Sequence, residues 1–215
     1  MRYHNRSSFV HAIERSMKNR LPMVVGIAIC LSFCGGLTKV FASDFEHVTK
    51  WATHEPGPLQ PFGSRNPQAV REIEQYEFMI GEWQCNERFR QADGNWIEEE
   101  SLVRGSYFLN GYGIMNQTFL RQSAVAMTYQ YDAESSSWAI TNASAPSFGK
   151  TEWVGQKVGA TMVASRESTS PAGAPITLSI TFLNIGPASF DWKLEATSAA
   201  GSLVVREKSC ARASG

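Results

Sequence analysis

The sequence contains no histidine after His54, although the chain runs to residue 215. Histidine is the usual general base and the most common metal ligand, so most of the chain lacks the residue best suited to both roles. A Ser-His-Asp or Cys-His arrangement is therefore excluded there, and no glycine-rich phosphate loop is present. We expect no catalytic residue, no metal site and no cofactor, and we predict that the protein is not an enzyme. An enzyme that uses Tyr, Glu or Lys inside a cavity stays as an alternative.

The chain also lacks net charge, with 20 basic and 20 acidic residues. Six of the basic residues but only one acidic residue precede residue 43, so the remainder has 14 basic and 19 acidic residues and is mildly acidic. Nucleic acids and anionic membrane surfaces bind clustered positive faces. The sequence therefore predicts no nucleic-acid partner.

The apolar run near the amino terminus is too short to cross a bilayer, which requires about 20 residues. This run, 21–33, follows five basic residues within 1–20, which is typical of a signal peptide. Val40 and Ala42 place short side chains at the −3 and −1 positions of a cleavage site. We predict a signal peptide over 1–42, a mature start at Ser43, and a bacterial periplasmic or secreted protein.

Two alternatives to cleavage after Ala42 remain, a lipoprotein and an uncleaved membrane anchor. A lipoprotein attached at Cys34 would have the bulky Phe33 where a small residue is expected, and an uncleaved membrane anchor is the other possibility.

Of the four cysteines, only Cys85 and Cys210 follow the predicted signal peptide. An even pair in an exported protein predicts a disulfide, with two buried free thiols as the alternative. Two cysteines without histidine do not make a four-ligand zinc site.

The sequence after residue 42 predicts a linker, then a short helix, and then a series of strands. Residues 43–66 contain several prolines and glycines without a sustained period, which predicts an extended linker. Asn66 and Pro67 suit the first positions of a helix, and an apolar stripe after them predicts a short helix over about 67–77. From Gly81 onward, apolar and polar residues alternate with a period of two, as in half-buried strands.

Ten strands are predicted in this alternating part. They cover residues 81–90, 96–104, 113–121, 123–131, 137–143, 151–155, 160–167, 175–183, 189–197 and 202–210. A meander of ten strands has two unpaired edge strands unless the sheet closes into a barrel. Cys85 and Cys210 favour closure independently, because they lie in the first and last strands. We therefore predict an all-β fold over 67–215, a closed up-and-down antiparallel barrel of about ten strands with a short N-terminal helix.

The segment Phe78-Met79-Ile80-Gly81-Glu82-Trp83 resembles the opening strand of calycin-like barrels, in which a G-x-W motif follows a short helix. Leu109-Asn110-Gly111, 127–132 and 138–140 fit the later pattern. The resemblance extends over 78–212, and the chain looks most like a bacterial lipocalin-like domain of unknown function, close in architecture to the nitrobindins.

This resemblance implies two further features. In calycins, an arginine near the last strand covers the G-x-W tryptophan. If a disulfide pairs residue 85 with 210, residue 83 lies opposite 212, so Arg212 is the expected structural partner of Trp83. Nitrobindins bind haem through a histidine late in the barrel, and no histidine exists there in this chain, so haem is not expected.

A ten-stranded barrel is wider than an eight-stranded one, whose interior is just filled by side chains. Two polar residues are predicted to share the inward faces, Glu87 with Trp83 and Asn142 with Trp138. A few polar groups in an apolar cavity are typical of ligand sites. We predict a small apolar ligand, with the site made of Trp83, Glu87, Phe89, Met127, Tyr129, Trp138, Asn142 and Trp192. The alternative is a filled core, with the protein acting as an accessory or interaction protein through its outer surface.

Overall fold

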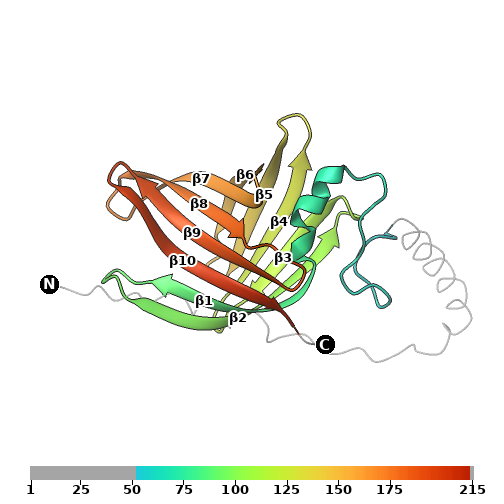
Figure 1. Ribbon diagram of the computed structural model, residues 1–215, viewed down its shortest axis with the longest axis horizontal. Coiled ribbons are helices and arrows are strands. Elements are labelled where there is room, and N and C mark those ends of the chain that lie inside the picture. Colours follow the sequence, from blue (N-terminus) through green and yellow to red (C-terminus); the bar gives the residue numbers. More distant parts are fainter. Residues whose placement is uncertain (1–51, 214–215) are drawn as a thin grey trace, which may run out of the picture. The chain divides into compact units, whose positions relative to one another are not determined.

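Strand β1 (Gly81–Arg90) buries every second residue from Gly81 to Glu87, as a period of two requires. The computed structural model, which describes residues 52–213, continues in nine further strands (Figure 1). They are β2 (Trp96–Phe108), β3 (Gly113–Phe119), β4 (Ala124–Asp132), β5 (Ser137–Ala145), β6 (Lys150–Val158), β7 (Thr161–Thr169), β8 (Pro175–Leu183), β9 (Ser189–Ser198) and β10 (Gly201–Arg212). Each strand pairs antiparallel with the next, and β10 pairs with β1 to close the barrel. The predicted fold class and the ten strands are confirmed.

The pairing of β1 with β10 places Cys85 opposite Cys210, and the two form a disulfide. The same register places Trp83 opposite Arg212 and Glu87 opposite Lys208. Directly opposite residues of an antiparallel pair point to the same face. The predicted disulfide and its register are therefore confirmed, and they determine which side chains of the last strand enter the barrel.

The helix η1 (Arg71–Met79) begins later than the sequence predicts. Asn66 accepts the backbone N–H of Gln68 at 2.9 Å, as a cap would, but its amide also donates to the carbonyl of Asn110 at 3.1 Å. These bonds hold residues 66–69 in a turn against the barrel, so the helix begins only at Arg71. Among residues 52–213, no helix is long and apolar enough to span a membrane.

η1 is a 3₁₀ helix, and its period of three residues aligns Ile73, Tyr76 and Met79 on one fully buried face. The ring of Tyr76 lies 4.6 Å from that of Tyr129 and 4.8 Å from that of Trp138 between centroids. The helix thus closes one end of the barrel with an aromatic cluster, and Figure 1 shows it beside β3 and β4 at that end.

The G-x-W motif lies at this closed end. Gly81 has a φ of 118°, and a Cβ atom there would lie 2.5 Å from Nη1 of Arg212, so the position requires glycine. Trp83 donates its indole N–H to the carbonyl of Met79 at 2.9 Å. The guanidinium carbon of Arg212 lies 4.2 Å from the centre of the Trp83 ring. The expected covering of Trp83 by Arg212 is confirmed.

Residues 52–66, the described part of the predicted linker, are hydrogen-bonded to the barrel. His54 N donates to the Asn110 side chain at 3.0 Å, and Tyr107 N donates to the Phe62 carbonyl at 2.8 Å. This segment therefore lies against the end of β2 and the turn that follows it. The predicted signal peptide, residues 1–42, lies outside the described residues.

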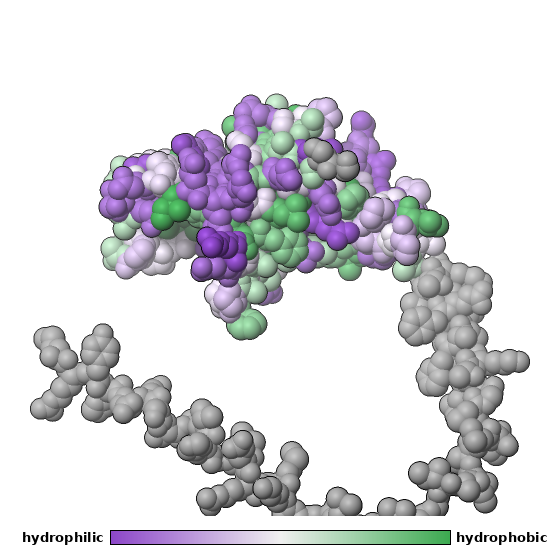
Figure 2. Space-filling view, turned by 90° about the horizontal axis from the view of Figure 1, so that it is seen from below, coloured by the Kyte–Doolittle hydropathy of each residue, from purple (hydrophilic) through white to green (hydrophobic). Residues whose placement is uncertain are grey.

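The outer face of the barrel is mixed in character. Figure 2 shows one side of it, where hydrophilic residues cover much of the surface and hydrophobic residues gather near the middle. Leu102 and Phe119, which lie opposite each other on β2 and β3, are 40% and 42% exposed. The outer face of the barrel is therefore not uniformly polar.

Replacing both Cys85 and Cys210 by serine tests the role of the closing bond. The disulfide spans 125 residues, and the chain-entropy model assigns a loop of that length about 4 to 5 kcal/mol. We expect the double variant to lose roughly that much unfolding free energy in urea. The parent protein under reducing conditions is the control and should lose a similar amount. In protein that begins at Ser43, which lacks Cys30 and Cys34, two titratable thiols after denaturation without reduction would contradict the bond.

Candidate functional site

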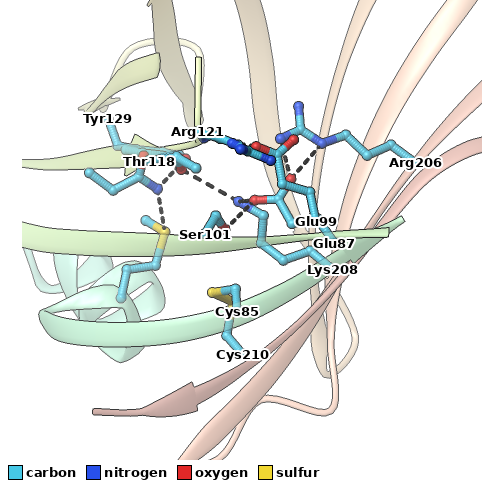
Figure 3. A network of polar contacts seen from close by, with 12 residues as sticks. Cys85, Glu87, Glu99, Ser101, Thr118, Arg121, Tyr129, Arg206, Lys208 and Cys210 are labelled. Atoms are coloured by element: carbon cyan, nitrogen blue, oxygen red, sulfur yellow. Dashed lines mark hydrogen bonds and ion pairs between the residues drawn. A yellow bond between two sulfur atoms is a disulfide. The ribbon is translucent and has the colours of Figure 1, made fainter. Parts of the chain in front are cut away.

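A charged cluster lies inside the barrel beyond the disulfide. It consists of Glu87, Arg206 and Lys208, with the hydroxyls of Ser101 and Thr118 beside them (Figure 3). The Glu87 side chain is fully buried, whereas those of Lys208 and Arg206 are 9% and 21% exposed. Carboxylates and ammonium groups are rarely buried to this extent, so the cluster is the most unusual feature of the interior.

Both cations bind the single carboxylate. Lys208 Nζ lies 2.8 Å from Glu87 Oε1, and Arg206 donates to Oε2 through Nε at 2.8 Å and through Nη2. Ser101 donates its hydroxyl to Oε1, and Lys208 also donates to Thr118 Oγ1 at 3.4 Å. Figure 3 shows the side chains of Arg206 and Lys208, both from β10, reaching the carboxylate of Glu87. Glu87 is therefore satisfied by β2 and β10 together.

Burial and pairing have opposite effects on Glu87. Burial penalises its charged form, but attraction from Lys208 and Arg206, with hydrogen bonds from Lys208 and Ser101, outweighs that penalty and lowers its pKa. Glu87 is therefore ionised at neutral pH. For Lys208 the balance is reversed: burial lowers its pKa from 10.5 to about 8, and Glu87 offsets only part of this effect. Lys208 thus keeps its proton near pH 7 and loses it in mildly alkaline solution.

Arg206 is held by aromatic rings as well as by Glu87. Its guanidinium carbon lies 4.4 Å from the ring centre of Phe89 and 5.3 Å from that of Trp192. A second inward arginine, Arg166, lies 4.9 Å from the ring centre of Trp153. Cation–π contacts of this kind add stabilisation where water is partly excluded. They also restrict the position of the Arg206 side chain.

A cavity of about 120 Å³ adjoins this cluster within the barrel. Most of its wall is apolar or aromatic, and its polar wall includes both cations of the cluster. The lining residues are Val103, Asn116, Thr118, Val125, Met127, Tyr129, Asn142, Trp153, Ile180, Phe182, Phe190, Trp192, Leu194, Arg206 and Lys208. Asn116 donates to the hydroxyl of Tyr129 at 3.2 Å, so this buried pair satisfies one side of the wall. The interior is therefore not completely filled.

The residues predicted to bind a ligand fall into three groups. Met127, Tyr129, Asn142 and Trp192 line the cavity. Glu87 and Phe89 contact Arg206, which also lines it. Trp83 and Trp138 are fully buried in the aromatic cluster of the closed end and do not line the cavity. The structure thus brings the first two groups together and separates the third.

Neither Arg206 nor Lys208 is among the residues that were predicted to point inward. The sequence did contain a signal for their orientation. The same pairing of 85 with 210 that predicts Arg212 opposite Trp83 also places Lys208 opposite Glu87. It places Arg206 opposite Phe89 as well. Thr118 and Trp153 carried no comparable signal. Their place beside the cavity depends on how the middle strands pair across the barrel.

A larger groove, of about 720 Å³, is formed by residues of β1, β2, β9 and β10 together with Leu183 of β8. Its lining also includes the inward side chains of Glu87, Glu99, Trp192 and Lys208. Its outward side chains include Arg88 and Glu207, which form an ion pair, and Asp191, which accepts hydrogen bonds from Ser209 at 2.7 Å and Asn184 at 2.6 Å. These groups are largely exposed to solvent and pair with one another. Groups that are already solvated and paired gain little from a ligand, so the smaller interior cavity is the better candidate site.

Comparison with known proteins places the chain in no family. No protein-family model matches the sequence, and no curated protein matches it. Among solved structures, an S-type phycobiliprotein lyase from Guillardia theta is similar over 66% of this chain and 92% of that chain, with 11% identity and a TM-score of 0.44. A redesigned β-barrel is similar over 68% of this chain and 100% of that chain, with 9% identity and a TM-score of 0.28. Function is therefore inferred from this barrel's own residues.

The buried carboxylate gives a stability test with a matched control. Glu87→Gln leaves Arg206 and Lys208 without a counter-charge, and breaking a buried ion pair in this way costs about 3 to 5 kcal/mol. Arg88→Gln, one residue along β1, removes an exposed ion pair with Glu207 and should cost about 0 to 1 kcal/mol. Urea unfolding at pH 7 measures both variants. Equal losses in the two variants would show that the cluster is not effectively buried.

Proposed function

We propose that this chain is an exported bacterial protein whose barrel binds one small, predominantly apolar molecule. The observation that supports binding most directly is the cavity of about 120 Å³, whose wall is mostly apolar and includes the polar side chains of Asn142, Arg206 and Lys208. Small-molecule sites typically combine an apolar wall with a few well-placed polar groups. This barrel has that combination next to the charged cluster.

The size of the cavity limits the ligand. An apolar cavity of about 150 Å³ in another protein holds benzene, so this cavity suits a molecule with about one ring or a short chain. η1 and its aromatic cluster close one end of the barrel, and η1 is the only helix within residues 52–213. A ligand therefore enters from the other end, and a longer one extends towards it.

The surface-acting alternative has one observation in its favour. The groove of about 720 Å³ on β1, β2, β9 and β10 is larger than the interior cavity, and it combines carboxylates with Arg88 and Lys193. A partner protein would contact the outward side chains of this groove, such as Arg88 and Lys193. If the protein acts through this outer surface, the interior cavity has no ligand and small molecules do not bind in it.

Fluorobenzene, observed by ¹⁹F NMR, separates the two functions. We expect about one molecule to bind per barrel. Val125→Trp should abolish binding because Val125 lines the cavity and a larger side chain fills it. Ala126→Trp is the control, since the next residue of β4 points to the outer face. If the parent protein does not bind, or if Val125→Trp binds equally well, the cavity function fails and the surface function stands.

Export is the second part of the proposal. Basic residues followed by the 13-residue apolar run at 21–33 support it, and so does the Cys85–Cys210 disulfide, which suits an oxidising compartment. Periplasmic location is proposed for the mature form that begins at Ser43. A membrane-anchored form is the alternative.

The intact mass of the protein recovered from the periplasm tests cleavage. We expect a mass that begins at Ser43. Ala42→Phe should retain residues 1–42, because a bulky side chain at −1 does not fit the signal peptidase site. Ala52→Phe, beyond the cleavage site, should be processed normally and serves as the control. A lipidated species beginning at Cys34, or a parent protein that keeps residues 1–42, would contradict the proposal.

A further inference from the structure

The inner face of the barrel carries more positive than negative groups. The strand registers direct seven charged side chains inward, of which five are buried or half-buried: Glu87, Glu99, Arg166, Arg206 and Lys208. The other two, Lys157 and Arg212, are exposed. Two carboxylates therefore accompany three cations among the charged groups withdrawn from solvent. A charge inside a protein is costly unless an opposite charge lies close to it. The interior thus has room for one more negative group.

Negative charge is short at two places on the inner face. One is Arg166, which forms no ion pair within residues 52–213 and whose Nε is buried without a hydrogen-bond partner, and the other is the charged cluster at the cavity. Both oxygens of Glu87 are engaged, Oε2 by Arg206 and Oε1 by Lys208 and Ser101. Glu99, opposite Glu87 on β2, accepts the backbone N–H of Arg121 at 2.8 Å and forms no ion pair with any residue of 52–213. One carboxylate therefore serves two cations that line the cavity.

Both cations retain donors for a ligand. Arg206 binds Glu87 through Nε and Nη2, which leaves its Nη1 hydrogens. Lys208 binds Glu87 and Thr118, which leaves one of three ammonium hydrogens. The rings of Phe89 and Trp192 already hold the Arg206 guanidinium, so a ligand does not bear the entropy cost of ordering it.

We propose that the ligand is a small monocarboxylic acid whose carboxylate binds Arg206 and Lys208 and whose apolar part occupies the cavity. This inference rests on the proposed function and adds the chemical class of the ligand. A single negative charge balances the excess of the cluster, whereas a dianion such as phosphate exceeds it. The remaining wall, which includes Val125, Met127 and Ile180, suits a hydrocarbon ring or chain.

Two probes of nearly equal shape and different charge test the class. 4-Fluorobenzoate and 4-fluorobenzamide each have one ring, and only the first carries a charge at pH 7. We expect ¹⁹F NMR titration to show at least tenfold tighter binding of the benzoate. Binding of the benzamide should resemble that of fluorobenzene, because it uses the apolar wall alone.

Variants of the two cations test the assignment to residues. Arg206→Met should weaken benzoate binding at least tenfold and change benzamide binding less than threefold. Glu87 keeps Lys208 as a partner in this variant, so no buried charge is left alone. Arg166→Met is the control, because it removes an inward cation that does not line the cavity, and it should change benzoate binding less than threefold. Lys208→Met provides a second variant if Arg206→Met does not fold.

The pH dependence is a readout that a purely structural role of Lys208 does not affect. Lys208 faces Glu87 on β1, Thr118 on β3, Arg206 on its own strand and the Trp192 ring on β9 at 5.6 Å. Burial lowers the pKa of Lys208 to about 8 in the free protein, and a bound carboxylate favours the protonated ammonium. Benzoate affinity should therefore be full below pH 8 and decline as the pH rises above it. Benzamide affinity, and benzoate affinity in Lys208→Met, should lack this decline.

The outcomes separate this inference from the function beneath it. A benzoate preference that Arg206→Met or Lys208→Met removes supports the carboxylate site. Equal binding of benzoate and benzamide, or a preference that both variants retain, overturns the carboxylate site and leaves a small-molecule barrel. If fluorobenzene does not bind, the proposed function fails, and this inference, which rests on it, fails with it.

Discussion

The pairing of β1 with β10 is the interaction on which the interior depends. Successive side chains of a strand point to opposite faces, so a slip of one residue would turn the inward set of β10 outward. Cys210 would then lose Cys85, Arg212 would leave Trp83, and Lys208 would leave Glu87. The disulfide links these two strands and fixes their register covalently. Closure, the covered tryptophan and the charged cluster are thus consequences of one alignment.

The two halves of the barrel use their interiors differently. At the closed end, the ring of Tyr76 packs against those of Tyr129 and Trp138 at centroid distances below 5 Å. Beyond the disulfide, Glu87 and its two cations replace such packing. A buried ionic cluster is a poor source of stability compared with apolar residues of the same volume. Its position beside the cavity is consistent with a role in binding rather than in folding.

Neighbouring residues on the same strands show how strongly the environment determines the strength of an ion pair. Arg88 and Glu207 pair on the outer face, while Glu87 and Arg206 pair on the inner face one step away. Solvent screens the outer pair, so its loss costs little. The inner pair is largely removed from water, and its loss leaves a charge without compensation. The same residue types therefore have different consequences on opposite faces of one sheet.

The sequence by itself determined the ten strands, the closed barrel, the disulfide and the contact of Arg212 with Trp83, because a period of two and one pair of cysteines are local or pairwise signals. It also placed Glu87 and Asn142 on inward faces. It misplaced the start of η1, because the bonds of Asn66 to the turn after β2 override its capping signal. Only the tertiary structure separated Trp83 and Trp138 from the cavity and brought Thr118 to Lys208, 90 residues away. Which inward side chains share one cavity depends on strand register around the whole barrel and on the depth of η1, and no short segment of sequence contains that information.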